Sequence, residues 1–240
     1  MVHLDLHRLS RRQRQLFIRD RFNEDLIHIN GKIVEMGGLC EQVITNSNLS
    51  IKDNNVQMAE NAILLDEKID LLETEINESV IKAIALRQPV ADDLRVLFSA
   101  IKISGAFERV GDLCKNIAKR SQLLTEEHHT DIRNQIFKLG EKVKKQLTKS
   151  INAYTNQDVK LARKVWKNDY KIDQMYTDLF ENLLVYLRKK KRVASGSHLM
   201  IIAKNYERIG DHTTHIGEMT HFAITGENLV AVRPKVNLPV

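Results

Sequence analysis

Apolar positions recur at helical spacing along most of the chain. Hydrophobic side chains return every three or four residues between 65 and 83, and again between 165 and 183. Polar clusters interrupt the pattern at 45–50, 126–131, 152–157 and 193–197. Gln88-Pro89 adds a fifth break, because proline suits the first turn of a new helix. The pattern therefore predicts six helices, near residues 21–45, 52–88, 89–124, 131–152, 157–191 and 197–225.

The scarcity of turn residues narrows the fold class. The chain of 240 residues has only 10 glycines and 3 prolines, below the usual shares of roughly 7% and 5%. Sandwiches and barrels need frequent glycine and proline turns, so the composition argues against both. Long helices joined by short loops pack as antiparallel bundles. We therefore expect an all-α protein.

Two sequence motifs occur twice and in the same order. Asp-Glu-Lys-Ile-Asp at 66–70 returns as Asp-Tyr-Lys-Ile-Asp at 169–173, and Phe-Glu-Arg-Val-Gly-Asp at 107–112 returns as Tyr-Glu-Arg-Ile-Gly-Asp at 206–211. The repetition indicates two tandem copies of a three-helix unit, that is, two three-helix bundles. The expected parts are a basic N-terminal arm at 1–20, a first repeat at 21–125, a second repeat at 131–226 and a C-terminal tail at 227–240.

Each copy carries two carboxylates four residues apart, Glu108 with Asp112 and Glu207 with Asp211. At this spacing the two side chains share one helical face, with Cβ atoms about 5 to 6 Å apart. Two like charges there destabilise an isolated helix, and a bound cation would reverse the sign. Carboxylate oxygens suit Mg²⁺, Ca²⁺, Mn²⁺ or iron. A solvated polar face is the alternative, since the apolar seam lies opposite the acids.

Further positions extend both motifs. Asn116 and His215 lie one turn beyond the second acid, and imidazole is a good ligand for iron, zinc or manganese, so the second copy should bind metal at least as well. Gly111 and Gly210 lie inside helices, where each costs about 1 kcal/mol relative to alanine. A glycine in both copies suggests close approach of a backbone or a ligand.

Charged neighbours of the acids have two interpretations. Arg109 and Arg208 could hold the carboxylates in place or form salt bridges between helices. Four aspartates lie on or next to the inward-facing stripe: Asp66, Asp70, Asp169 and Asp173. They could complete the metal site or pair with an arginine such as Arg95, and the salt bridge is the favoured interpretation.

The Glu-Arg-Val-Gly-Asp and Glu-Arg-Ile-Gly-Asp segments, with Gln-Pro-Val-Ala-Asp-Asp-Leu-Arg at 88–95 and Ala-Lys at 203–204, resemble the PhoU family of bacterial phosphate-uptake regulators. The resemblance covers roughly residues 24–226. It implies pseudo-twofold symmetry and multinuclear clusters of iron, manganese, zinc or magnesium. The implied metal residues are Glu108, Asp112, Glu207 and Asp211. His215 departs from the asparagine common at this position, which Asn116 retains.

The resemblance also implies a role. Such a protein is a negative regulator of phosphate uptake and phosphate-starvation signalling, a cytoplasmic adaptor between the ATPase of a phosphate ABC transporter and a membrane sensor histidine kinase. We expect a homodimer that reaches the membrane through its partners. No Walker motif or nucleophile elbow is present in the sequence, so we expect no enzymatic turnover.

Two alternatives from other classes stay open. Glu218 and His221 have the Glu-x-x-His spacing of ferritin-like dinuclear-metal enzymes, but no second such pair lies in a predicted helix. The basic segment at 188–192 and the net charge of +6 fit a helical nucleic-acid-binding protein. Nucleic acid is the less favoured partner, because the basic residues form separate patches. The residues at 188–192 are also explained by their place at a helix C-terminus, where cations are favourable.

Overall fold

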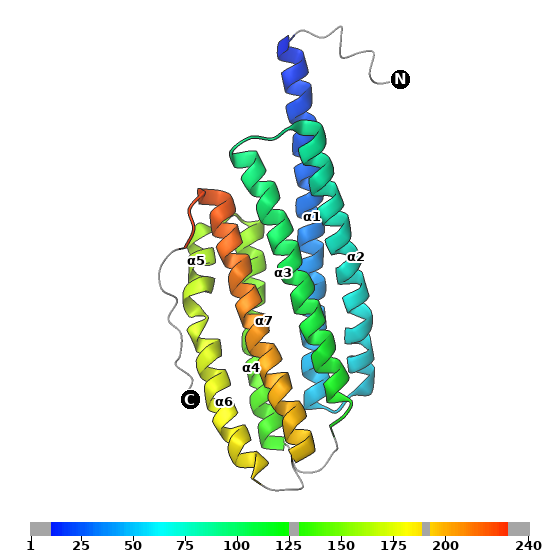
Figure 1. The fold of residues 1–240 in the computed structure, drawn as a ribbon, viewed down its shortest axis with the longest axis vertical. Helices are drawn as coiled ribbons and strands as arrows, with labels where there is room; N and C mark the ends of the chain where they lie inside the picture. Colours follow the sequence, from blue (N-terminus) through cyan, green and yellow to red (C-terminus); the bar gives the residue numbers. More distant parts are fainter. Residues whose placement is uncertain (1–10, 125–129, 189–192, 230–240) are drawn as a thin grey trace.

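The computed structural model describes residues 11–124, 130–188 and 193–229, with side chains from residue 19 onward. These ranges contain long helices joined by short connections (Figure 1). No helix within them is both long and apolar enough to cross a bilayer. The helices are α1 (Arg11–Lys52), α2 (Val56–Arg87), α3 (Asp92–Ser121), α4 (Thr130–Thr155), α5 (Val159–Asn168), α6 (Tyr170–Leu187) and α7 (Val193–Thr225).

The helices form two bundles that lie side by side (Figure 1). In the first bundle α1, α2 and α3 pack against one another, and in the second α4 and α7 pack with α5 and α6. The bundles join where α3 lies along α7 and α1 along α4. The predicted all-helical fold with two three-helix repeats is confirmed.

The repeat is visible in the burial pattern as well as in the motifs. The offset of 103 residues between Asp66 and Asp169 also superposes the buried side of α4 on that of α1. Six of the buried residues of α4 are Ile132, Ile136, Leu139, Val143, Leu147 and Ser150, and their counterparts in α1 are Ile29, Ile33, Met36, Cys40, Ile44 and Ser47, which are all buried too. The same helical positions therefore build the core in both copies.

The first helix is longer than predicted at both ends. It begins at Arg11 rather than near residue 21, so the second half of the expected N-terminal arm is helical. It continues through the polar cluster at 45–50, where we predicted a break, and ends at Lys52. Asn54 has a left-handed φ of 51° in the connection, and Asn55 accepts a hydrogen bond from the Met58 N–H and so caps α2.

The polar cluster stays helical because its side chains bind neighbouring helices. Ser47 Oγ donates to the Cys114 carbonyl at 3.1 Å, and Ser50 Oγ lies 2.9 Å from Ser121 Oγ. Asn48 Nδ2 donates to the Phe137 carbonyl at 3.2 Å. These bonds satisfy buried polar groups, so residues that favour turns in isolation are retained inside a helix.

The helix predicted at 157–191 is present in two parts. Asp158 caps α5 by accepting from the Leu161 N–H, and the helix is interrupted at the buried Asp169, after which α6 begins. Figure 1 shows α6 continuing along the same side of the bundle as α5. Residues 1–10, 189–192 and 230–240 lie outside the described residues, and with them most of the expected tail and of the basic 188–192 segment.

Candidate functional site

The two repeated motifs meet within each copy. A Cβ atom on Gly111 would lie 3.2 Å from Ile69 Cδ1, and one on Gly210 would lie 3.0 Å from Ile172 Cγ2. The glycines therefore admit the isoleucine of the Asp-x-x-Ile-Asp motif from the facing helix. The close approach expected at these glycines is made by a side chain of the neighbouring helix.

In the first repeat, acids from two helices share one electrostatic environment. Partial burial raises the pKa of Glu108, the Arg109 guanidinium opposes this, and the carboxylates of Asp112 and Asp70 raise it further. Burial also raises the pKa of Asp70, and Asp66 adds to the effect. We call the four carboxylates Asp66, Asp70, Glu108 and Asp112 the first acidic face.

Asp66 is the most enclosed member of this face. Its side chain is 0% exposed, and its Oδ2 accepts a hydrogen bond of 2.5 Å from Lys115 Nζ on α3. This hydrogen bond is the main cause that raises the pKa of Lys115. Asp66 Oδ1 is buried without a hydrogen-bond partner. The salt bridge predicted for this aspartate is present, but with a lysine instead of Arg95, which pairs with Asp92 at 3.0 Å.

Arg109 connects the two acids of its own motif. Its Nε lies 3.3 Å from Glu108 Oε2, and its Nη1 lies 3.4 Å from Asp112 Oδ2. The side chains of Glu108 and Asp112 are 25% and 39% exposed, so both reach solvent. Arg109 therefore pairs with acids of its own helix, whereas the second interpretation expected a salt bridge between helices. Asn116, one turn further, is exposed.

The second repeat satisfies its buried aspartate differently. Asp169 Oδ1 accepts hydrogen bonds from Thr214 Oγ1 at 2.8 Å and from Gln146 Nε2 at 3.1 Å. Thr214 follows Asp211 by three residues, as Lys115 follows Asp112. The same position of the motif therefore provides a lysine to Asp66 in the first repeat and a threonine to Asp169 in the second.

The remaining acids of the second motif have partners of their own. Glu207 Oε2 lies 2.6 Å from Lys204 Nζ, which also sits 5.3 Å from the centre of the Tyr176 ring. His215 Nδ1 lies 3.3 Å from Glu218 Oε2. Asp211 is exposed and Asp173 is half-buried. Lys204, one turn before Glu207, therefore offsets the negative charge of the second motif. The first repeat has Gly105 at the equivalent position.

The two motifs approach each other across the contact between α3 and α7. Burial lowers the pKa of His212, Asp211 opposes this, and the cations Arg208 and Arg109 lower it further. Since Arg109 belongs to α3, the arginines of both motifs lie near the same histidine. We call Glu108 with Asp112, and Glu207 with Asp211, the two acidic stripes.

The described residues do not form a cluster of metal ligands. Within the ranges 11–124, 130–188 and 193–229, no three His, Cys, Asp or Glu side chains converge as a ligand set. His221 is buried, its Nε2 accepts from Arg163 Nε at 2.9 Å, and its Nδ1 donates to the Glu227 carbonyl at 2.9 Å. Both ring nitrogens are occupied, which removes Glu218 with His221 as a ferritin-like ligand pair.

The partners of the acids are the residues that the sequence analysis missed. Lys115 and Thr214 hold the two buried aspartates from equivalent positions, and Gln146 adds a bond from α4. Lys204 was noted only as part of a resemblance. An alignment of the two repeats places Lys115 opposite Thr214 and would have drawn attention to both.

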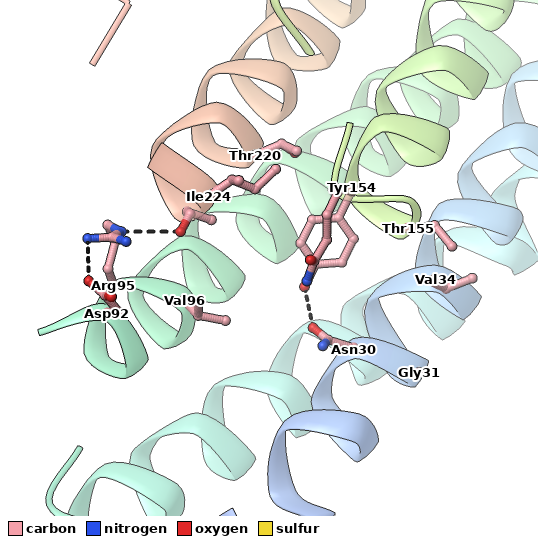
Figure 2. A pocket seen from close by; sticks show the side chains of 12 residues that line it. Asn30, Gly31, Val34, Asp92, Arg95, Val96, Tyr154, Thr155, Thr220 and Ile224 are labelled. Atoms are coloured by element: carbon pink, nitrogen blue, oxygen red, sulfur yellow. Dashed lines mark hydrogen bonds and ion pairs between the residues drawn. The ribbon is translucent and has the colours of Figure 1, made fainter. Parts of the chain in front are cut away.

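A cavity of about 560 Å³ lies at one end of the contact between the repeats, among α1, α3, α4 and α7 (Figure 2). Its polar groups bind one another: Arg95 pairs with Asp92 and donates to the Ala223 carbonyl at 3.2 Å, and Tyr154 Oη donates to Asn30 Oδ1 at 2.5 Å. The predicted metal residues do not line it. The cavity is thus a feature of the junction between the repeats, separate from the acidic stripes.

Comparison with known proteins gives the family. The PhoU domain model matches residues 33–121 and 136–220, one match in each repeat. The phosphate-specific transport system accessory protein PhoU homolog of Caulobacter vibrioides is 38% identical over 219 residues, which cover 90% of this chain and 95% of that protein. The homolog of Zymomonas mobilis is 40% identical over 209 residues, covering 87% and 88%.

Solved structures agree. The crystal structure of PhoU from Pseudomonas aeruginosa has a TM-score of 0.80 and 26% identity, covering 86% of this chain and 100% of that one. The phosphate transport system regulatory protein PhoU from Streptococcus pneumoniae, with a TM-score of 0.81 and 23% identity over 88% and 100%, supports the fold. With both repeats matched and its relatives covered nearly end to end, the chain belongs to the PhoU family.

Proposed function

We propose that this protein is an accessory and regulatory protein of a phosphate-specific transport system. The observation that carries the proposal is the match over nine-tenths of the chain to relatives of that name, with both PhoU domains present. The family is a regulatory and non-enzymatic one, in line with the expectation of no turnover. The protein then acts by binding other proteins rather than by chemistry on a substrate.

The finer role is that of a negative regulator between the transporter ATPase and a membrane sensor histidine kinase in the cytoplasm. The duplicated fold supports this proposal, because two related repeats can offer one binding surface to each partner. Deleting the gene should raise expression of phosphate-starvation genes in phosphate-rich medium, and the intact gene should restore repression. Unchanged expression after deletion would contradict the regulatory role.

The partners need a direct experiment. The full chain, used as bait in phosphate-replete cells, should retain the transporter ATPase and the kinase. Recovery of neither protein would remove the adaptor hypothesis even if the deletion has a phenotype. Light scattering on the purified protein checks the expected homodimer.

We further propose that the acidic stripes bind hard cations. Burial is the main cause that raises the pKa of Glu108 and Asp70, and repulsion from neighbouring carboxylates adds to it; a bound cation would offset both effects, which supports the proposal. Asp70, Glu108 and Asp112 would hold the ion in the first repeat after their side chains rotate toward it, because they do not converge as a ligand set in the described part of the chain. The second repeat would use Glu207, Asp211 and His215. The ion would supply the positive charge that joins the acids of α2 and α3.

Metal content tests this proposal directly. Protein purified without chelator and incubated with Mn²⁺, Fe²⁺, Zn²⁺ or Mg²⁺ should retain metal, measured by elemental analysis after gel filtration. The double variant Glu108→Gln with Glu207→Gln should lose most of it. The charge-matched control Glu60→Gln with Glu181→Gln, at exposed positions outside the motifs, should retain it. Equally low metal in all three proteins would refute metal binding.

A further inference from the structure

Five lysines surround one small cavity in the second repeat. The cavity has a volume of about 160 Å³ and lies between α4, α5 and α6. Its other lining residues are Gln146, Val165 and Asn168, so no acid contributes to the wall. The lysines are Lys142, Lys145 and Lys149 of α4, Lys164 of α5 and Lys171 of α6. We call this group the lysine pocket.

The charges of the lysine pocket are not balanced within the described part of the chain. None of the ion pairs formed by those residues includes one of the five lysines. Burial lowers the pKa of Lys142, and repulsion from Lys171, Lys149 and Lys145 lowers it further. Like charges gathered around a cavity destabilise the folded state, and a bound anion would reverse that effect.

Comparison of the two repeats shows that the fold does not require these lysines. With the offset of 103 residues that superposes the buried positions, the counterparts of the five lysines are Leu39, Gln42, Asn46, Asn61 and Lys68. The first bundle is therefore built on the same core with a single lysine at these places. Nor do Lys142, Lys145 and Lys149 lie in the last turn of α4, which ends at Thr155, so favourable placement at a helix C-terminus does not explain them.

We propose that the lysine pocket binds a phosphate group. Lysine ammonium groups are compact point charges that bind phosphate well, and several around one cavity favour a multiply charged anion over chloride. The amides of Asn168 and Gln146 already donate to the Lys164 carbonyl and to Asp169, so the ammonium groups supply the contacts. A volume of about 160 Å³ holds one compact anion with a few waters, each of which occupies about 30 Å³.

The phosphate group can belong to free inorganic phosphate or to a lipid headgroup, because both present the same oxygens. The inference is independent of the proposed regulatory role and of the acidic stripes, since it uses other residues on other helices. Either proposal can therefore fail without the other.

The first test exchanges pocket lysines for the residues that the first repeat has at the same places. Titration calorimetry and thermal unfolding of the full chain are measured with inorganic phosphate, against chloride at equal ionic strength. Phosphate should bind and raise the melting temperature. In the variant Lys145→Gln with Lys149→Asn, the dissociation constant should rise about tenfold or more, because two charges near the anion are lost. Both lysines are exposed, and circular dichroism checks that the variant folds.

A charge-matched control and a second ligand complete the experiment. The variant Lys82→Gln with Lys119→Asn removes two exposed lysines from the first repeat and should bind phosphate as the unaltered chain does. Cosedimentation with vesicles containing phosphatidic acid, against phosphatidylcholine alone, identifies a lipid source. Binding to either ligand that depends on Lys145 and Lys149 supports the pocket. Binding to neither, equal loss in the control variant, or lysine-dependent binding to RNA alone would overturn it.

Discussion

Removing Lys115 from its salt bridge with Asp66 should destabilise the protein more than removing Asp66 does. Asp66 is fully buried, with one oxygen unpaired, whereas the Lys115 side chain is 28% exposed and can turn to water. Lys115→Met keeps the length of the side chain but leaves a carboxylate buried without its cation. Asp66→Asn keeps the shape and a hydrogen-bond acceptor, and it leaves a lysine that solvent can reach.

The magnitudes follow from this difference. Breaking a fully buried ion pair costs about 3 to 5 kcal/mol, because one charge stays uncompensated. Partial exposure of Lys115 lowers that figure, so we expect Lys115→Met to reduce the free energy of unfolding by about 2 to 3 kcal/mol. Asp66→Asn loses mainly a charge-assisted hydrogen bond, and we expect a loss of about 1 kcal/mol.

Urea unfolding at neutral pH, followed by far-ultraviolet circular dichroism, measures both losses. The hydrogen bond that Lys115 donates to Asp66 raises the pKa of Lys115, so the contribution of the pair is complete below the ordinary lysine pKa and is lost as the pH rises through the raised value. The gap between the unaltered chain and Lys115→Met should therefore narrow only at strongly alkaline pH. An equal or larger loss in Asp66→Asn would show that the buried carboxylate is not the source of the cost.

Three further substitutions test the packing and the charges described above. Gly111→Ala should lose about 1 to 2 kcal/mol in urea unfolding, since overpacking against Asp66 Oδ1 at 2.9 Å and Ile69 outweighs the gain in helix propensity; an increase in stability would contradict the packing described. Asn48→Ala should lose about 1 to 3 kcal/mol, because Tyr206 Oη donates to Asn48 Oδ1 at 3.3 Å and would be left buried and unpaired; a neutral result would show that another group replaces it. Glu108→Gln should stabilise the metal-free protein at neutral pH by about 0.2 to 0.5 kcal/mol, because the raised pKa of Glu108 means that the fold disfavours its charged form. Thermal unfolding between pH 4 and 7 checks this last prediction: the advantage should shrink as the pH falls toward the pKa, and a loss at neutral pH would reverse the sign assigned to the acidic face.

Helix boundaries show what local sequence can and cannot predict. The break at Gln88-Pro89 was found because its cause is local: α2 ends at Arg87, and Gln88 takes a left-handed φ of 50° next to the proline. The polar cluster at 45–50 was misjudged because its causes lie elsewhere in the chain. Ser47 is held by Cys114, a residue 67 positions away, and no local pattern reports such a bond.

In the acidic motifs, too, some features could be predicted from the sequence and others could not. Their positions and their glycines followed from the internal repeat, because repetition is a property of the sequence. Their partners did not, since Lys115 reaches Asp66 across two helices and Lys204 reaches Glu207 within one. Neither the approach of α2 to α3 nor the rotamer of a lysine is encoded in a spacing rule.

The two copies share a core and differ in charge, and this contrast limits what each can do. Because the core is shared, the residue at an exposed position of one repeat can be compared with the residue at the equivalent position of the other. In the first repeat, Lys115 neutralises the buried Asp66, and the acids Glu108 and Asp112 of the same motif are partly exposed. The second has neutral partners for its aspartate, and its lysines gather around a cavity. The second repeat therefore offers a site for a phosphate group in addition to its acidic motif, and the first repeat has no equivalent cluster of lysines. Exchanging the residues between repeats, as in Lys145→Gln with Lys149→Asn, should therefore alter ligand binding and leave the fold unchanged.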